Sequence, residues 1–144
     1  MPSDTLAPLL VAISRALSPL VEVRAALLFG SHATGRARPD SDIDVAVLLD
    51  SQSIAQRDEH LRRIIVALSG ELASDRLDVI VLNGAPPTLV FQVLKYGRVA
   101  LERDPRDLHR LRVRTYSAHA DYAHVERFFR AVTKARALAG LQGG

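Results

Sequence analysis

The residues best suited to chemistry are two carboxylates, Asp42 and Asp44, which follow a Gly30-Ser31 pair after ten intervening residues. Positions two apart on a strand point to the same face, so these two carboxylates should lie together. Neighbouring carboxylates repel each other unless cations lie between them. Hard divalent cations prefer oxygen ligands, so the pair predicts a metal site.

A third carboxylate, Asp78, lies in another apolar segment, residues 77–82. It could complete a site for two metal ions, which typically lie about 3.5–4 Å apart and hold both oxygens of an in-line displacement. It could instead pair with Arg76, its near neighbour. A lone D-x-D or a lone Gly-Ser is weak evidence, and the order of all three features is what favours a functional site.

The Gly30-Ser31 pair directly follows an apolar segment that reads as a strand. A glycine there lets backbone N–H groups approach a ligand closely, and the start of a helix would favour an anion. The hydroxyl of Ser31 can donate to a phosphate oxygen. Metal ions beside a phosphate-binding loop indicate nucleoside triphosphate chemistry. The chain has no G-x-x-x-x-G-K-[ST] sequence, which excludes a P-loop enzyme.

The residues between the two halves of this pattern are candidates for nucleotide binding, namely Thr34, Arg36 and Ser41. Arg36 could bind the triphosphate with two parallel hydrogen bonds, or it could be an ordinary solvated charge. Ser41 could orient Asp42 or simply shape a turn. The five histidines show no zinc-ligand spacing, and we assign them no role.

Elements of two kinds must position these residues, because segments with strand character alternate with segments of helical periodicity. In chain order we expect a helix after Ser3-Asp4 that closes at Pro19, a strand over 23–29, a loop or short helix over 32–41, a strand over 43–49, a helix from about 53 to 74, a strand over 77–82, a helix from Pro87 to near Gly97, a short strand over 98–101, and one or two helices over 106–138. This pattern predicts an α/β or α+β domain but leaves the strand order open.

Composition excludes several classes of protein. The 144 residues suffice for one domain, and the absence of cysteine excludes disulfides, thiolate zinc sites and a cysteine nucleophile. The absence of tryptophan disfavours binding of single-stranded nucleic acid, and no apolar segment is long enough to span a membrane. Since no signal peptide is evident, we expect a cytoplasmic protein.

The residues on which a family resemblance rests are Leu28-Phe-Gly-Ser-His-Ala-Thr-Gly35 and Ser41-Asp-Ile-Asp-Val-Ala-Val47. Together they resemble the G-S-x10-D-x-D signature of the DNA polymerase β-like nucleotidyltransferases. The small size resembles the minimal nucleotidyltransferases, the MntA-like antitoxins that pair with HEPN-domain toxins. The resemblance covers roughly residues 20–103.

The resemblance implies a nucleotidyltransferase fold, a small mixed sheet with helices on one side, and two Mg²⁺ ions. It implies transfer of AMP from ATP to a protein hydroxyl, specifically a tyrosine of a HEPN toxin. Asp42, Asp44 and Asp78 would hold the ions, and Asp78 would accept the proton of the acceptor hydroxyl. Gly30 and Ser31 would bind the triphosphate.

Two other functions remain open at this point. The chain could neutralise a partner by occlusion without catalysis, or it could modify a small molecule of the aminoglycoside type. We expect a catalytic domain over residues 1–103 and a helical extension over 104–144 that packs on the domain, on a partner, or on both. Phe128 and Phe129 of that extension could contact the partner, and the chain could form a homodimer in isolation.

Charge supports a role for the extension. The whole chain carries a net charge of +3, yet residues 101–144 hold nine basic and five acidic side chains. A partner of this segment should therefore present an acidic surface. We expect no direct binding of nucleic acid and no membrane association.

Overall fold

The computed structural model describes residues 2–118 together with 127, 130, 131 and 134. Between residues 2 and 102 the chain alternates between helices and strands, as its periodicity predicts. The elements are α1 (Pro2–Leu17), β1 (Val23–Phe29), α2 (Ser31–Thr34), β2 (Ile43–Leu49), the 3-10 helix η1 (Ser51–Gln56), α3 (Arg57–Leu72), β3 (Leu77–Val81), α4 (Pro87–Tyr96) and β4 (Arg98–Glu102). Residues 105–118 form a further helix.

These bounds confirm the expected elements over residues 2–102, with small shifts. The helix expected from about residue 53 is divided into η1 and α3, and β3 ends one residue early, at Val81. The helical pattern expected to Leu138, including Phe128 and Phe129, lies outside the described residues beyond 118 except at isolated positions.

The four strands form one mixed sheet in the order β3-β2-β1-β4. β1 is antiparallel to both of its neighbours, β2 and β4, whereas β2 and β3 run parallel. The two central strands, β1 and β2, are consecutive in the chain, so they carry the ends of the Gly-Ser and D-x-D segments side by side. The sheet order therefore places the candidate site at one end of the sheet, where β1 ends and β2 begins.

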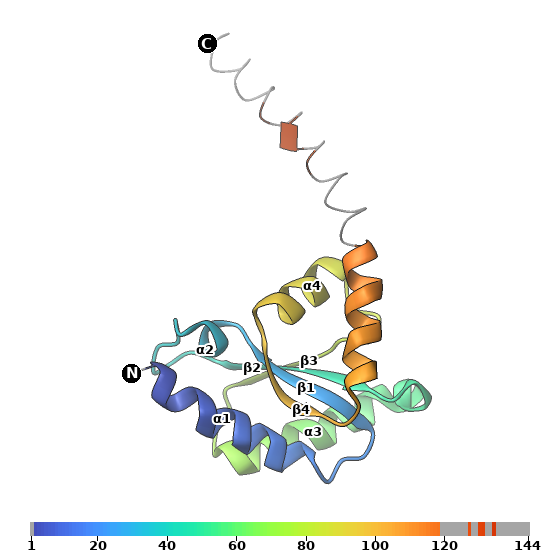
Figure 1. Cartoon of the computed structure of the whole chain (residues 1–144). Coiled ribbons are helices and arrows are strands. Elements are labelled where there is room, and N and C mark those ends of the chain that lie inside the picture. Colours follow the sequence, from blue (N-terminus) through green and yellow to red (C-terminus); the bar gives the residue numbers. More distant parts are fainter. Residues whose placement is uncertain (1, 119–126, 128–129, 132–133, 135–144) are drawn as a thin grey trace.

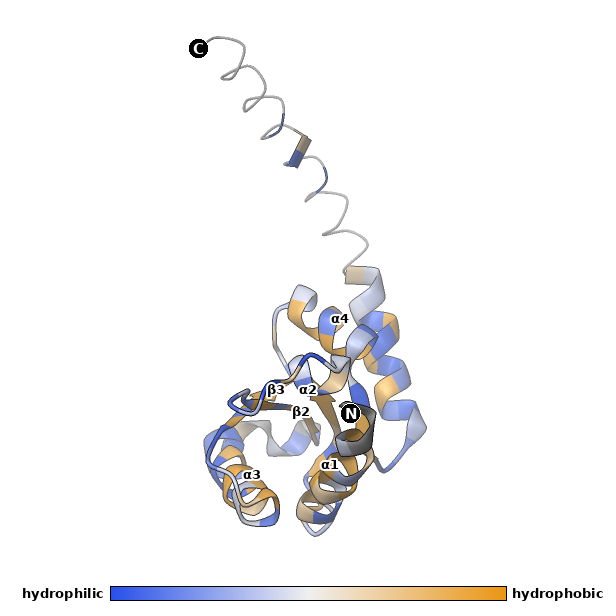
Figure 2. Ribbon diagram, turned by 90° about the vertical axis from the view of Figure 1, so that its left-hand side faces the viewer, coloured by the Kyte–Doolittle hydropathy of each residue, from blue (hydrophilic) through white to orange (hydrophobic). Residues whose placement is uncertain are grey.

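Helices cover both faces of the sheet (Figure 1). α1 and α3 pack side by side on one face, with their apolar sides turned toward the sheet (Figure 2). α4 and the helix over 105–118 cover the other face, where Leu108 and Leu111 are buried against α4 and the central strands. The expectation of helices on one side is therefore wrong. β1 and β2 are apolar on both faces, and a strand of that kind must be covered twice.

The helix over 105–118 belongs to the core of the domain through its buried leucines. An ion pair also ties it to β1, because the Arg24 Nε lies 2.9 Å from Asp107 Oδ2. The division of the chain at residue 104 stays a prediction. None of the helices among the described residues is both long enough and apolar enough to cross a membrane.

Candidate active site

Gly30 is the residue at which β1 stops and α2 begins. Its backbone has φ 72° and ψ −154°, a conformation that residues with a side chain rarely adopt. A Cβ atom added at this position would collide with the carboxylate of Asp44, its nearest neighbour. Only glycine therefore allows the chain to turn here while the Asp44 carboxylate lies against its backbone.

Asp44 and Asp78 are placed next to each other by strand pairing. They are register partners on the parallel strands β2 and β3, and Asp44 is also opposite Phe29, the last residue of β1. Both lie on the face covered by α4, because they alternate with Val45 and Val79, which pack toward α1 and α3. Asp42 precedes β2 by one residue. Asp44 is half-buried, whereas Asp42 and Asp78 are exposed.

The electrostatics of this cluster are unfavourable for an ionised Asp44. Burial raises the pKa of the Asp44 carboxyl above its ordinary value, and the charges of Asp78 and Asp42 raise it further, while His32 opposes the shift. Within residues 2–118, no hydrogen bond or ion pair satisfies any of the three carboxylates. Like charges crowded around the half-buried Asp44 disfavour its ionised form, so positive charge from a ligand would stabilise the cluster.

The hydroxyl groups of the intervening loop hold its backbone. The Thr34 hydroxyl donates to the carbonyl of Gly30 at 3.3 Å and lies 3.4 Å from that of Ser31. The Ser41 hydroxyl accepts a 2.8 Å hydrogen bond from the Arg38 amide, as a turn residue would. Arg36 is exposed, and its backbone amide donates to the Ser31 carbonyl at 2.9 Å. Of these residues, Ser41 directly precedes Asp42, and the contact of all three with a nucleotide stays a prediction.

Two residues that the sequence reasoning did not assign to the site lie within it. His32 Nε2 is 3.3 Å from the carbonyl oxygen of Ser41, and Arg76 Nη1 donates to the carbonyl oxygen of Asp40 at 2.7 Å. Arg76 thus bonds to the loop, and no ion pair between it and Asp78 is recorded in the described chain. The sequence signal was adjacency alone, since His32 follows Ser31 and Arg76 stands two residues before Asp78.

A family model described as "Polymerase beta, Nucleotidyltransferase" matches residues 12–106, which include every residue of this cluster. The chain belongs to this nucleotidyltransferase family. The three carboxylates and the glycine turn thus lie inside the domain that defines the family, and the chain is a nucleotidyltransferase.

Proteins of known description resemble this nucleotidyltransferase over most of its length. The protein adenylyltransferase MntA of Aphanizomenon flos-aquae is 26% identical over 129 residues, which cover 85% of this chain and 86% of that protein. A crystal structure of a toxin-antitoxin with AMP-PNP contains a chain that is 27% identical, with a TM-score of 0.63, covering 85% of this chain and 94% of its own. A chain of the MntA-HepT toxin-antitoxin is 25% identical, with a TM-score of 0.59 and coverages of 89% and 96%.

The chemistry of the donor set in this nucleotidyltransferase fits Mg²⁺. All three candidate ligands are carboxylates: Asp44 and Asp78 are register partners on two paired strands, and Asp42 lies just before β2. Among the described residues, no group of three or more acidic or histidine side chains is already arranged as a metal centre. Mg²⁺ commonly binds one or two carboxylates together with substrate phosphates and water, so the ions and the nucleotide would complete the site together.

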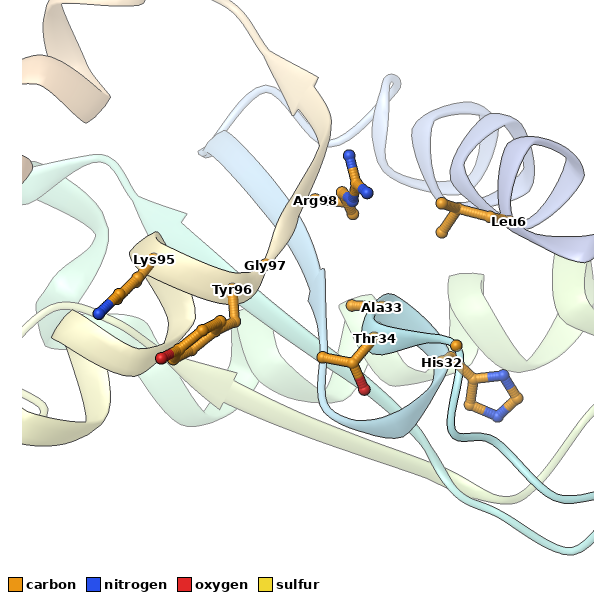
Figure 3. Close-up of a pocket in the computed structure, with 9 residues that line it drawn as sticks. Leu6, His32, Ala33, Thr34, Lys95, Tyr96, Gly97 and Arg98 are labelled. Carbon is orange, nitrogen blue, oxygen red and sulfur yellow. The ribbon is translucent and has the colours of Figure 1, made fainter. Parts of the chain in front are cut away.

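A cavity of about 650 Å³ adjoins the nucleotidyltransferase site on the side of α2 that faces α1 and the junction of α4 with β4 (Figure 3). Thr34, Tyr96 and Arg98 are among the residues that line it, and the three carboxylates are not. Lys95 also lines this cavity. Its Nζ lies 5.6 Å from the centre of the Phe91 ring and 5.3 Å from that of Tyr96, which indicates cation–π contacts.

Proposed function

We propose that this nucleotidyltransferase transfers AMP from ATP to a protein hydroxyl, with two Mg²⁺ ions held by Asp42, Asp44 and Asp78. The observation that carries the proposal is a group of three neighbouring carboxylates that have no partner in the described chain. It lies next to the turn at Gly30, where the Asp44 carboxylate approaches the backbone so closely that only glycine fits. Such a cluster is stable in a folded protein when a cationic ligand neutralises it.

The proposed reaction is a displacement at the α-phosphorus of ATP. The oxygen of the acceptor hydroxyl forms a bond to this phosphorus, the bond to the bridging oxygen of the β-phosphate breaks, and pyrophosphate leaves with the electron pair. Asp78 accepts the proton of the hydroxyl. Gly30 and Ser31 bind the triphosphate through backbone and hydroxyl groups, and Arg36 adds positive charge beside them. When bound, Mg²⁺ supplies the positive charge that neutralises phosphate and carboxylate oxygens.

The acceptor in this proposal is a tyrosine of a HEPN toxin, and the chain acts as the antitoxin. The support is similarity, since the curated relative is a protein adenylyltransferase and the similar solved chains come from toxin-antitoxin complexes, one of them with AMP-PNP. The similarity extends over nearly the whole of those chains, so this support is not confined to one short motif.

One observation favours a second candidate function, neutralisation by occlusion. The helix over 105–118 exposes Val113 and Tyr116 at 56% and 44%, beside three arginines for which the described residues supply no ion-pair partner. These arginines are Arg110, Arg112 and Arg114. An apolar and basic helix face of this kind could bind an acidic partner and block it without any chemistry.

The experiment that separates the two functions uses the protein and the product of the neighbouring gene. Both are incubated with Mg-ATP, and the partner is weighed by intact mass spectrometry. We expect the mass of one or more AMP groups on the partner, located on tyrosine by peptide sequencing, and no addition in EDTA. An unmodified partner in an intact complex would refute the transfer.

The matched variant is Asp42→Asn/Asp44→Asn, which removes two charges and keeps the size of both side chains. We expect a loss of AMP transfer on the order of 10³-fold or more, because the ions and the triphosphate lose their ligands. Complex formation by size-exclusion chromatography is the control. If the double variant neutralises its partner as fully as the wild type does, occlusion is the function and catalysis is secondary.

A further inference from the structure

Two consecutive backbone carbonyls directly before Asp42 are each held by a side chain from another part of the site. The carbonyl oxygen of Ser41 is 3.3 Å from His32 Nε2, and that of Asp40 accepts a 2.7 Å hydrogen bond from Arg76 Nη1. A carbonyl oxygen can only accept, so the proton of the His32 ring must be on Nε2. Both contacts therefore run from a side-chain donor to the main chain.

The two donors come from different elements, one before and one after the Asp42–Asp44 segment in the chain. His32 lies on α2 immediately after Ser31, and Arg76 lies two residues before Asp78 on the segment that enters β3. One contact therefore connects α2 to Ser41, and the other connects the segment that enters β3 to Asp40. Strand pairing brings Asp44 and Asp78 together, and these two contacts also join both neighbouring segments to the main chain directly before Asp42.

Asp42 needs such contacts because it lies outside the sheet. β2 begins at Ile43, and residues 34–40 are all exposed. The segment's other recorded hydrogen bonds are local, as in the Ser41–Arg38 turn, or lie one residue beyond Asp42, where the Ile43 amide donates to the Arg76 carbonyl at 2.9 Å. An exposed loop without side-chain contacts samples many conformations, and a catalytic ligand within it would lose its geometry.

We infer that His32 and Arg76 are positioning residues, which hold the main chain before Asp42 between the Gly30-Ser31 turn and the Asp78 strand. The inference rests on the proposed function for its kinetic consequence, but the geometry that it predicts exists without nucleotide or metal. His32 also lies within electrostatic reach of Asp44, which agrees with a place inside the site.

The kinetic test uses variants that keep or remove the donor. His32→Ala removes the Nε2 donor, and His32→Asn has a shorter side chain whose donor does not reach as far. For both variants we expect kcat for AMP transfer to fall roughly 10- to 100-fold. The KM for ATP should change less than kcat, because the Gly30-Ser31 turn that binds the triphosphate is intact. His32→Gln places an amide N–H near the position of Nε2 and should restore kcat to within about threefold of the wild type.

Arg76 is tested in the same way. Arg76→Ala removes the donor, whereas Arg76→Lys keeps the charge and a shorter donor, so the lysine variant should lie between alanine and wild type. In the double variant His32→Ala/Arg76→Ala, the loss should differ from the product of the single losses, because the two contacts act on adjacent carbonyls. His109→Ala and Arg62→Ala are the controls, since both residues are exposed and lie on elements that carry none of the candidate site residues, the helix over 105–118 and α3.

A second measurement does not depend on activity. Amide hydrogen exchange of residues 40–44 in the protein without nucleotide should become several-fold faster in His32→Ala and in Arg76→Ala, with the melting temperature nearly unchanged. Unchanged exchange there, or a His32→Gln variant as impaired as His32→Ala, would overturn the inference. A wild type without AMP transfer that still shows faster exchange in the variants would refute the proposed function and leave the positioning role standing.

Discussion

The two ends of the central strands β1 and β2 differ in whether their charged side chains have partners within the protein. Where β1 ends and β2 begins, Asp42, Asp44 and Asp78 lie together, and no partner for them is recorded in the described chain. At the other end, where β1 begins, the guanidinium of Arg103 is bonded to main-chain carbonyls through Nε and Nη2. It donates four hydrogen bonds of 2.6–3.2 Å to the carbonyls of Val23, Leu17, Ser18 and Leu20.

The same contrast holds for neighbouring groups at the second end. Arg24 pairs with Asp107, and the amide side chain of Asn83 both donates to and accepts from the main chain of Leu49. Polar groups that serve stability are satisfied inside the protein, because an unmet group costs free energy. Three like charges crowded together without a partner therefore favour the first end as the place where a ligand binds.

Among the substitutions that test this difference between the two ends, Gly30→Ala is expected to have the largest effect. A side chain there would meet the Asp44 carboxylate and force a backbone conformation that suits only glycine. We expect a loss of about 2–3 kcal/mol in the free energy of unfolding and a loss of AMP transfer of roughly 10²-fold or more. Urea unfolding and the partner mass assay measure the two effects.

The matched control for this prediction is Gly70→Ala. Gly70 lies within α3, and an added Cβ would meet nothing within 4 Å. We expect a gain of about 0.5–1 kcal/mol, because alanine favours a helix interior over glycine. If both substitutions had the same effect on stability, the special role of Gly30 would be wrong.

A smaller effect, confined to stability, is expected from Arg103→Ala. This change removes four hydrogen bonds that join the end of β4 to the segment between α1 and β1. We expect a loss of about 3 kcal/mol in the free energy of unfolding and an unchanged kcat below the melting transition. A selective loss of kcat with normal stability would show that the two ends are not separate in function. Arg62→Ala, on the exposed side of α3, should change neither quantity.

The smallest effect is expected from Asp44→Asn, which should stabilise the fold rather than destabilise it. The pKa of Asp44 is raised in the folded protein, so its ionised form at neutral pH destabilises the fold relative to the unfolded chain. The variant should therefore melt at a higher temperature than the wild type at pH 7 without metal. This difference should shrink as the pH falls through the raised pKa, because the wild-type carboxyl then takes up a proton.

Thermal melts at several pH values measure this difference directly. An Asp44→Asn variant less stable than the wild type at pH 7 would contradict the unfavourable electrostatics of the cluster. Addition of Mg-ATP should raise the melting temperature of the wild type more than that of the variant, since the carboxylate then gains its counter-charge.

Much of the site was predictable because it depends on short-range rules. The two-residue spacing of Asp42 and Asp44 predicts that they share one face of a strand, and the structure places Asp44 on β2 and Asp42 one residue before it. A glycine after an apolar strand indicates a tight turn, and the structure gives Gly30 a positive φ. His32 and Arg76 were missed for the opposite reason. Their partners are main-chain carbonyls, and carbonyls leave no trace in the sequence of side chains.

The helices that cover the second face of the sheet were also not predictable from the sequence alone. The apolar residues on both faces of β2 predicted a buried strand, but they did not say which helices would cover the second face. α4 and the helix over 105–118 do so, and the latter follows β4 in the chain. Its docking depends on Leu108 and Leu111 finding the space beside α4, which is a property of the assembled core.

The sequence by itself determined the chemical groups, their strands and helices, and the turn at Gly30, because propensity, periodicity and residue spacing act locally. Only the tertiary structure decided that Asp78 stands beside Asp44, since that requires β3 to pair in parallel with β2 across a 27-residue connection. It also decided which groups stay unpaired. Pairing depends on distances between remote segments, and those distances exist only once the chain has folded.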